Sequence, residues 1–171
     1  ADSFKDAKGF GWQFPAPQAN WQELKAKKNQ ELDRLEKIYQ KILRDNNVEL
    51  IPGKGQVLDP HTVAVADKTF TASKILLATG GWPALPKINR IEHAITSNEA
   101  LNLKDIPDKI VIVGGGFIAV EFAGIFNSFG SEVTVVIRGD NILRGFDQDV
   151  RQCLADQMEK RGIRIIKKAT V

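Results

Sequence analysis

The sequence has only one cysteine, Cys153, and only two histidines among its 171 residues. A single thiol cannot form a disulfide within the chain or a thiolate cluster around a metal. His61 falls in a predicted turn and His93 in a predicted connecting segment, so we expect both at the surface, with Cys153 on a helix face. We therefore predict no metal site and no internal disulfide.

Long apolar runs and a charge excess of one sign are also missing. No apolar stretch is long enough to span a bilayer, and the N-terminal residues lack the charged-then-apolar pattern of a signal peptide. The 24 basic and 21 acidic residues are spread along the chain, with no basic cluster interleaved with aromatics. We expect no nucleic-acid or membrane partner, and a soluble, cytoplasmic, globular protein.

Residues 110–137 carry the clearest pattern in the chain. The apolar run at 110–113 predicts a parallel strand with both faces covered by helices. Residues 117–129 predict an apolar helix that ends at Gly130, and residues 133–137 predict a second strand. The order strand, turn, helix, strand indicates an α/β fold with a βαβ dinucleotide-binding unit, of the FAD/NAD(P)-binding Rossmann-like class.

The turn between the first strand and the helix contains three small residues in the spacing G-x-G-x-x-A: Gly114, Gly116 and Ala119. The first glycine lets the chain reverse tightly, the second lets the backbone approach a pyrophosphate, and the small third residue lets the helix pack on the strand. We expect the pyrophosphate to bind the free amides that open the helix.

The second strand lacks the acidic residue with which a pocket for NADH binds the adenosine ribose. Arg138 stands there instead, and Arg144 follows in the same loop. A guanidinium group matches the charge and the oxygens of a 2′-phosphate, which a carboxylate would repel, so the pattern favours NADPH. Asp140 lies in a turn after Gly139 and is poorly placed to replace the missing acid. The alternative is that both arginines are solvated surface residues.

The remaining patterns predict helices and a short meander. Residues 1–20 are expected to be irregular, and Asn20 with Glu23 indicates the start of a helix over about 21–45. Five strand-like runs follow, VELI, QVL, TVAV, FTA and KILLAT, which predict a meander beside a buried strand at 75–79. Further expected elements are a short helix near 97–101, a helix over 147–161 and a strand at 163–166.

Four segments occur together in a characteristic order: ILLATGGWP, ITSNEA, VGGGFIAVEFAG and RGDNILRGFD. With them the chain closely resembles the flavoprotein disulfide reductases. The resemblance implies that residues 1–80 are the latter part of an FAD-binding domain and residues 81–171 the first part of an NADPH-binding domain. Members of the family pass a hydride from NADPH to FAD and reduce a cysteine pair that splits a disulfide substrate, and they form homodimers. The cysteine pair, the first FAD-binding glycine motif, the His-Pro segment and the dimer-forming segments are absent from this sequence.

The resemblance also assigns individual residues. Gly55, Thr79 and Gly80 match contacts to FAD, although ordinary strand ends or β-turns would explain them too. The edge of the nicotinamide pocket is matched by four residues of the glycine turn and its helix: Gly116, Phe117, Ile118 and Glu121.

Glu121 also stands out from its sequence setting, because it is a carboxylate in a helix that is apolar nearly all round. Burying such a charge costs several kcal/mol unless it is paired. In the family its partner is a lysine near the flavin, from a segment missing here, which gives Glu121 a role in catalysis. The alternative is an acid that reaches solvent at the helix edge.

The resemblance implies glutathione disulfide as the substrate, and two features keep alternatives open. Members that act on glutathione disulfide usually have tyrosine at the position of Phe117, whereas trypanothione reductases often have phenylalanine and a similar loop after the second strand. Against the latter, residues 129–132 lack the insertion that those enzymes carry. A stand-alone NADPH-binding module without catalysis is a further alternative.

Overall fold

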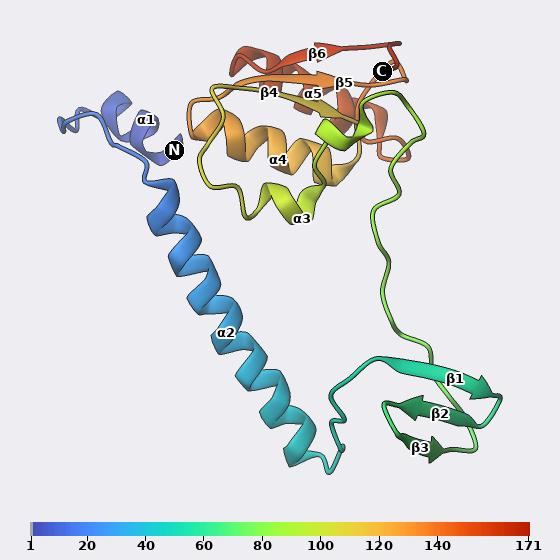
Figure 1. Cartoon of the computed structure of the whole chain (residues 1–171). Helices are drawn as coiled ribbons and strands as arrows, with labels where there is room; N and C mark the ends of the chain where they lie inside the picture. The colour runs from blue at the N-terminus through green and yellow to red at the C-terminus, as the bar shows by residue number, and fades with distance from the viewer. Residues whose placement is uncertain (1) are drawn as a thin grey trace. The chain divides into compact units, whose positions relative to one another are not determined.

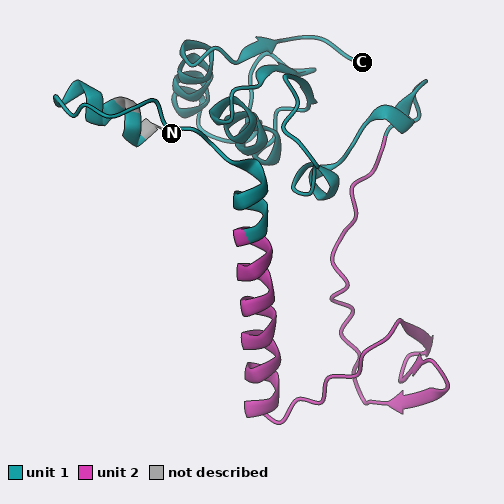
Figure 2. Ribbon diagram, turned by 60° about the vertical axis from the view of Figure 1, so that its left-hand side comes forward, with its two compact units in different colours: residues 1–26, 86–171 teal, residues 27–85 magenta. Residues whose placement is uncertain are grey.

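The protein is described by a computed structural model that covers residues 2–171; Ala1 lies outside the described residues. The chain divides into two compact units, residues 1–26 with 86–171 and residues 27–85 (Figure 2). The elements are α1 (Asp2–Gly9), α2 (Trp21–Asp45), β1 (Gly55–Asp59), β2 (Thr62–Val65), β3 (Lys68–Thr71), the 3₁₀ helix η1 (Ile91–His93), α3 (Ser97–Ala100), β4 (Lys109–Val113), α4 (Phe117–Ser128), β5 (Glu132–Val136), α5 (Gln148–Lys160) and β6 (Arg164–Ile166).

The first unit is built on a parallel sheet of three strands in the order β4-β5-β6 (Figure 1). Ile110 pairs with Val133, and Val135 pairs with Ile165, in parallel register. Helix α4 connects β4 to β5, and α5 connects β5 to β6. The predicted βαβ unit is therefore confirmed, and a second crossover follows it directly.

The central strand β5 forms the core of this unit. Its residues from Val133 to Val136 are all buried, which is typical of a parallel strand covered on both faces. The buried cluster around it draws on α3, α4, α5, the loop after β5 and the turn before β6: Ala100, Ala123, Phe126, Val133, Val135, Ile137, Ile142, Leu143, Ala155, Met158 and Ile163.

The expectation that residues 110–113 are covered on both faces is wrong. In β4 the exposed fractions of Val111 and Val113 are 62% and 58%, whereas Ile110 and Ile112 pack against the core. Successive side chains of a strand point to opposite faces, so β4 is packed only on the face of Ile110 and Ile112, and the face of Val111 and Val113 is open.

Helix ends follow the expected chemistry. Gly130 ends α4 with a φ of +96°, a conformation that glycine adopts without strain. Helix α3 begins with a capping box in which the Asn98 N–H donates to the Thr96 hydroxyl, and the Thr96 N–H donates to the Glu99 carboxylate. The Thr96 hydroxyl and the backbone N–H groups that donate to this carboxylate hold the pKa of Glu99 below its ordinary value.

The N-terminal segment is more ordered than expected. Residues 2–9 form α1 instead of irregular chain. The ring of Phe14 packs edge-on against Phe4, at 5.8 Å between centroids, and lies 5.6 Å from the Lys8 ammonium. These contacts span Gly9 and Gly11, whose turn character dominates the local pattern, so short-range patterns do not reveal the helix.

Helix α2 has the predicted bounds. The Asn20 side chain accepts a hydrogen bond from the Glu23 N–H at 3.0 Å, which caps the first turn. Trp21 fixes this end within the first unit, because its indole N–H donates to the Leu103 carbonyl at 2.9 Å and its ring packs edge-on against Phe129 at 5.3 Å.

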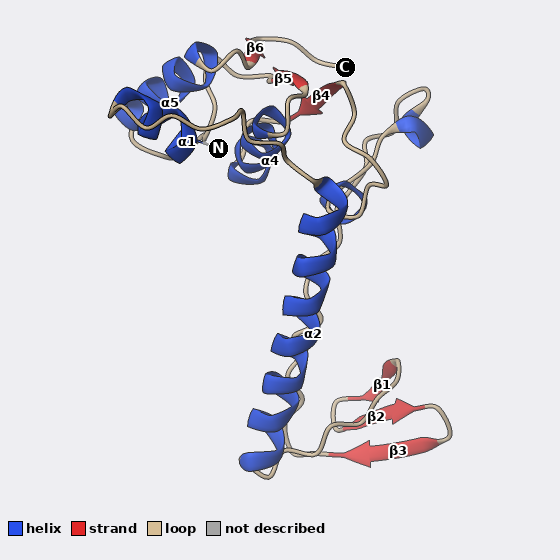
Figure 3. Cartoon of the chain, turned by 90° about the vertical axis from the view of Figure 1, so that its left-hand side faces the viewer, coloured by secondary structure: helices blue, strands red, loops and turns tan. Residues whose placement is uncertain are grey.

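The second unit contains the antiparallel meander β1-β2-β3, as expected. The predicted strands at 48–51 and 75–79 are wrong: both segments lack helix and strand, and the chain stays a loop through residue 88 (Figure 3). Leu76 and Leu77 are 88% and 69% exposed. A strand needs a neighbour that takes its backbone hydrogen bonds, and no described strand pairs with either run.

Candidate functional site

The turn between β4 and α4 uses its three glycines for different purposes. Gly114 has a φ of +123°, which side chains rarely adopt, and its N–H donates to the Val136 carbonyl at 2.9 Å. A Cβ at Gly115 would lie 2.9 Å from the Ile137 Cγ2 and 3.4 Å from the Ile142 Cα, so the fold itself requires glycine there. Gly116 has ordinary dihedral angles and no heavy atom within 4 Å of a Cβ, so the packing leaves space at this position.

Gly116 is also the N-cap of α4 and supplies no side chain to the helix start. The amides of the first turn have no acceptor within the helix, and no acidic residue stands in that turn. Phe117 and Ile118 are 66% and 50% exposed beside these amides, and Ala119 is half-buried. Free N–H groups at the positive end of a helix dipole suit an anion such as a pyrophosphate.

The loop at 138–146 follows β5 and is tied to the glycine turn. The Leu143 N–H donates to the Gly115 carbonyl at 2.6 Å, and Ile142 is fully buried beneath the turn. The Lys168 N–H donates to the Gly139 carbonyl at 3.0 Å. The main chain of this loop is therefore fixed beside the opening of α4.

Arg138 and Arg144 are exposed at the two ends of this fixed loop segment. Among residues 2–171 neither guanidinium group has a hydrogen bond or an ion pair, so both are free to bind an anion. Asp140 lies between them and its carboxylate is 3.7 Å from the Arg151 guanidinium. The residues present thus fit a phosphate-bearing dinucleotide: an open glycine, free amides and two unpaired cations.

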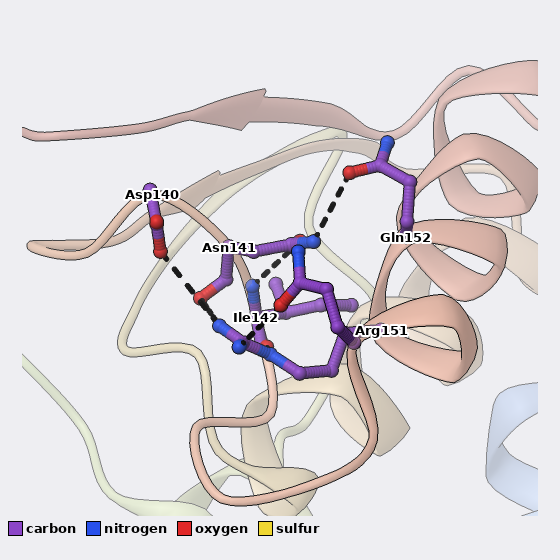
Figure 4. A network of polar contacts seen from close by, with 6 residues as sticks. Asp140, Asn141, Ile142, Arg151 and Gln152 are labelled. Carbon is purple, nitrogen blue, oxygen red and sulfur yellow. Dashed lines mark hydrogen bonds and ion pairs between the residues drawn. The ribbon is translucent and has the colours of Figure 1, made fainter.

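A polar network joins the loop to α5 (Figure 4). Arg151 donates through Nε to the Ile142 carbonyl at 2.7 Å and through a terminal nitrogen to the Asn141 carbonyl at 3.3 Å. The Asn141 side chain accepts from the Ile142 N–H at 2.9 Å and donates to Gln152 at 3.3 Å. Neither Arg151 nor the packing role of Gly115 could be predicted from the sequence, because both act through tertiary contacts that leave no local pattern.

Glu121 lies on α4, and its expected lysine partner belongs to a segment outside residues 1–171. It is exposed on α4, and no hydrogen bond or ion pair of its side chain is found within the described residues. Exposure within residues 2–171 fits an acid that reaches solvent, and the pairing with that lysine stays a prediction. Glu121 lies one helical turn after Phe117, close to the glycine turn.

The three candidate FAD contacts lie in the second unit. Gly80 has a φ of +73° and Thr79 is exposed in the loop after the meander. A Cβ at Gly55 would make only an ordinary contact of 3.6 Å with Val63, so the packing of β1 does not require glycine. No hydrogen bond between described residues joins Gly55 to the other two.

His61 and His93 are exposed, and Cys153 is an exposed thiol on α5, as predicted. None of the helices formed by residues 2–171 is both long and apolar enough to cross a bilayer.

The fold and the glycine turn define a dinucleotide-binding protein of the Rossmann-like class. Comparison with known proteins narrows this class. Residues 5–171 match the family described as pyridine nucleotide-disulphide oxidoreductase. The chain belongs to this family.

Individual relatives agree with this assignment. The chain is 45% identical over 168 residues to a glutathione reductase of Nostoc sp., which covers 98% of this chain and 37% of that protein. It is 41% identical to a trypanothione reductase of Trypanosoma congolense, with coverages of 96% and 37%. The Cu(II) complex of the HOCl-induced flavoprotein disulfide reductase RclA from Escherichia coli has a similar structure, with a TM-score of 0.81 and 30% identity over 90% of this chain and 36% of that one. The chain thus spans little more than a third of the proteins that it matches.

Proposed function

We propose that the complete protein containing these residues is an NADPH-dependent, FAD-containing disulfide reductase that acts on glutathione disulfide. The observation that carries the proposal is the pair of unpartnered guanidinium groups, Arg138 and Arg144, on a loop fixed beside the open glycine turn. This arrangement has positive charge where a site for NADH needs a carboxylate.

The proposed roles follow the chemistry of each group. The amides at Gly116, Phe117, Ile118 and Ala119 hold the pyrophosphate, with Gly114 shaping the turn, and the two arginines hold the 2′-phosphate. Glu121 lies on the nicotinamide side of α4, where an exposed carboxylate pairs with a lysine of a segment outside residues 1–171. When bound, NADPH supplies a hydride and FAD passes the electron pair towards a disulfide.

The second unit contributes to FAD binding in this proposal. Gly55, Thr79 and Gly80 are assigned to the flavin nucleotide, within an FAD-binding domain that includes residues 1–80, while residues 81–171 belong to an NADPH-binding domain. A glycine at position 55 that the packing does not require, and a left-handed glycine at position 80, support close approach of a ligand to the backbone. We further propose a cytoplasmic homodimer, with the dimer contact outside these residues.

Glutathione disulfide is preferred over trypanothione disulfide for one specific reason. The alignment with the Nostoc protein fits within the length of this chain, whereas the alignment with the T. congolense protein extends over 180 residues, more than the 171 of the whole chain. The T. congolense protein therefore has additional residues in the aligned region that this chain lacks. Phe117, which matches trypanothione reductases, points the other way, so a direct assay must compare both disulfides.

The test uses the complete protein as purified, with any FAD that it binds. An absorption spectrum of bound flavin and turnover of glutathione disulfide with NADPH are expected, with little turnover of trypanothione disulfide. Arg138→Glu should raise the KM for NADPH far more than that for NADH, because a carboxylate repels the 2′-phosphate. Colourless protein that binds NADPH would leave only a binding module, and an unchanged coenzyme preference in Arg138→Glu would remove the phosphate assignment.

A further inference from the structure

We propose that Arg151 is a positioning residue that sets the preference for the 2′-phosphate, although it belongs to α5 and not to the phosphate-binding loop. This inference rests on the proposed function, because it concerns the same coenzyme site. It extends that function by naming the residue that holds Arg138 and Arg144 in place.

The geometry of Arg151 is that of a clamp on the main chain. Its Nε donates to the Ile142 carbonyl at 2.7 Å, and a terminal nitrogen donates to the preceding carbonyl, that of Asn141, at 3.3 Å. The other terminal nitrogen donates to the Gln148 side chain at 2.8 Å, one helical turn earlier. The side chain is only 15% exposed, and its N–H groups donate to protein acceptors.

The two carbonyls that accept from Arg151 belong to Asn141 and Ile142, which lie between Arg138 and Arg144 in the sequence. On the other side of the loop, the Leu143 N–H is bonded to the Gly115 carbonyl at 2.6 Å. The segment is therefore held from α5 and from the glycine turn at once. Fixing the main chain of this segment before the coenzyme arrives removes the cost of ordering the loop from the free energy of binding.

Arg151 also controls the one acidic group in this segment. The Asp140 carboxylate is 79% exposed and would repel a phosphate dianion bound between the arginines. Its Oδ1 lies 3.7 Å from the Arg151 guanidinium, which offsets its charge. Lysine at position 151 would keep a positive charge, but its single ammonium group cannot reproduce the planar fork that spans two carbonyls.

The test measures two adenosine ligands that differ only in the 2′-phosphate: adenosine 2′,5′-bisphosphate and 5′-AMP. Their Kd values are compared by titration calorimetry in the complete protein and in the variants Arg151→Met and Arg151→Lys. Lys160→Gln is the matched control, because Lys160 is an exposed cation in the last turn of the same helix and, within residues 2–171, has no hydrogen bond or ion pair to the loop or the glycine turn.

Arg151→Met is expected to raise the Kd of the bisphosphate about tenfold, which corresponds to about 1.4 kcal/mol, while the Kd of 5′-AMP changes less than about twofold. Arg151→Lys should lie between parent and Arg151→Met, and Lys160→Gln should match the parent. In turnover, Arg151→Met should raise the KM for NADPH and leave kcat and the KM for NADH nearly unchanged. A structural role alone would lower both affinities together.

Each outcome decides one of the two proposals. If the parent protein does not prefer the bisphosphate over 5′-AMP, the proposed function fails. If the parent prefers it and Arg151→Met keeps the same ratio of Kd values, or loses both ligands equally, the role of Arg151 is wrong while the function stands. If Arg151→Met does not fold, Arg151→Lys decides in the same way; failure of both to fold would make Arg151 a stability residue and refute the inference.

Discussion

Replacing Gly116 with alanine is expected to weaken coenzyme binding while the free energy of unfolding stays nearly the same. The φ of −78° and ψ of 174° at this position are accessible to alanine, and no heavy atom lies within 4 Å of the added Cβ. The only cost to folding is the lower preference for alanine at an N-cap, below about 1 kcal/mol.

The binding cost arises because the Cβ occupies the space through which a pyrophosphate reaches the amides of α4. Losing one charge-assisted hydrogen bond between an N–H group and a phosphate oxygen costs about 1.5–3 kcal/mol. This energy raises the Kd of NADPH by a factor of roughly 10 to 150. Both NADPH and 5′-AMP should be affected, since each brings a phosphate to these amides.

The assay pairs calorimetric titration of both ligands with urea unfolding of the complete protein. Gly124→Ala serves as the control, because Gly124 is an exposed glycine inside α4, with open space around its Cβ position. That variant should gain about 0.5–1 kcal/mol of stability and bind normally. Unchanged coenzyme affinity in Gly116→Ala, with both proteins folded, would refute the placement of the pyrophosphate on this turn.

Three other substitutions test contacts that stabilise the first unit. Gly115→Ala should lower the free energy of unfolding by about 1–3 kcal/mol in urea titrations, because its Cβ would lie 2.9 Å from Ile137. Thr96→Val should raise the pKa of Glu99 towards its ordinary value in a ¹³C NMR titration, since the hydroxyl that donates at 2.6 Å is lost. Trp21→Phe should cost about 1 kcal/mol in the same unfolding assay, because the Leu103 carbonyl loses the indole donor and keeps only the longer hydrogen bond from the Lys25 ammonium, at 3.2 Å.

The sign of the Glu99 effect is defined by its lowered pKa. The carboxylate stabilises α3 fully above its ordinary pKa, and this contribution is lost as the pH falls through the lowered value in the folded protein. Thr96→Val should reduce that acid-dependent loss, because the backbone N–H groups of Thr96 and Glu99 still donate to the carboxylate, and an unmoved pKa would mean that these groups alone determine it. An unchanged free energy of unfolding in Gly115→Ala would show that Ile137 can move without cost. An unchanged value in Trp21→Phe would show that the aromatic ring, and not the indole N–H, accounts for the contribution of Trp21 to stability.

Local patterns were sufficient for α2, α3, α4 and α5, because caps and turn glycines act over three or four residues, but they did not reveal α1. Asn20 and Glu23 define the start of α2, and Gly130 defines the end of α4. Patterns that depend on distant partners were less informative. The apolar run at 74–79 has the composition of a strand, yet no described strand accepts its hydrogen bonds.

The candidate site shows the same division. The glycine spacing and Arg138 follow from short-range sequence, whereas the exposure of Glu121 depends on what else packs against α4. Arg151 lies in a helix of ordinary composition, and its significance comes only from the carbonyls of Asn141 and Ile142 that fold back on it. Every residue of the loop has a main-chain carbonyl whatever its side chain, so a hydrogen bond from a side chain to such a carbonyl cannot be predicted from the residue types of the loop.

The loop after β5 is held by its main chain, through the carbonyls of Gly139, Asn141 and Ile142 and the amide of Leu143. The side chains of Arg138 and Arg144 take no part in this scaffolding. Because, within residues 2–171, these two side chains make no contact that stabilises the loop, both residues can be substituted at little cost to the free energy of unfolding. If the proposed site is right, the preference between NADPH and NADH can be changed by substituting these two side chains, without redesigning the backbone.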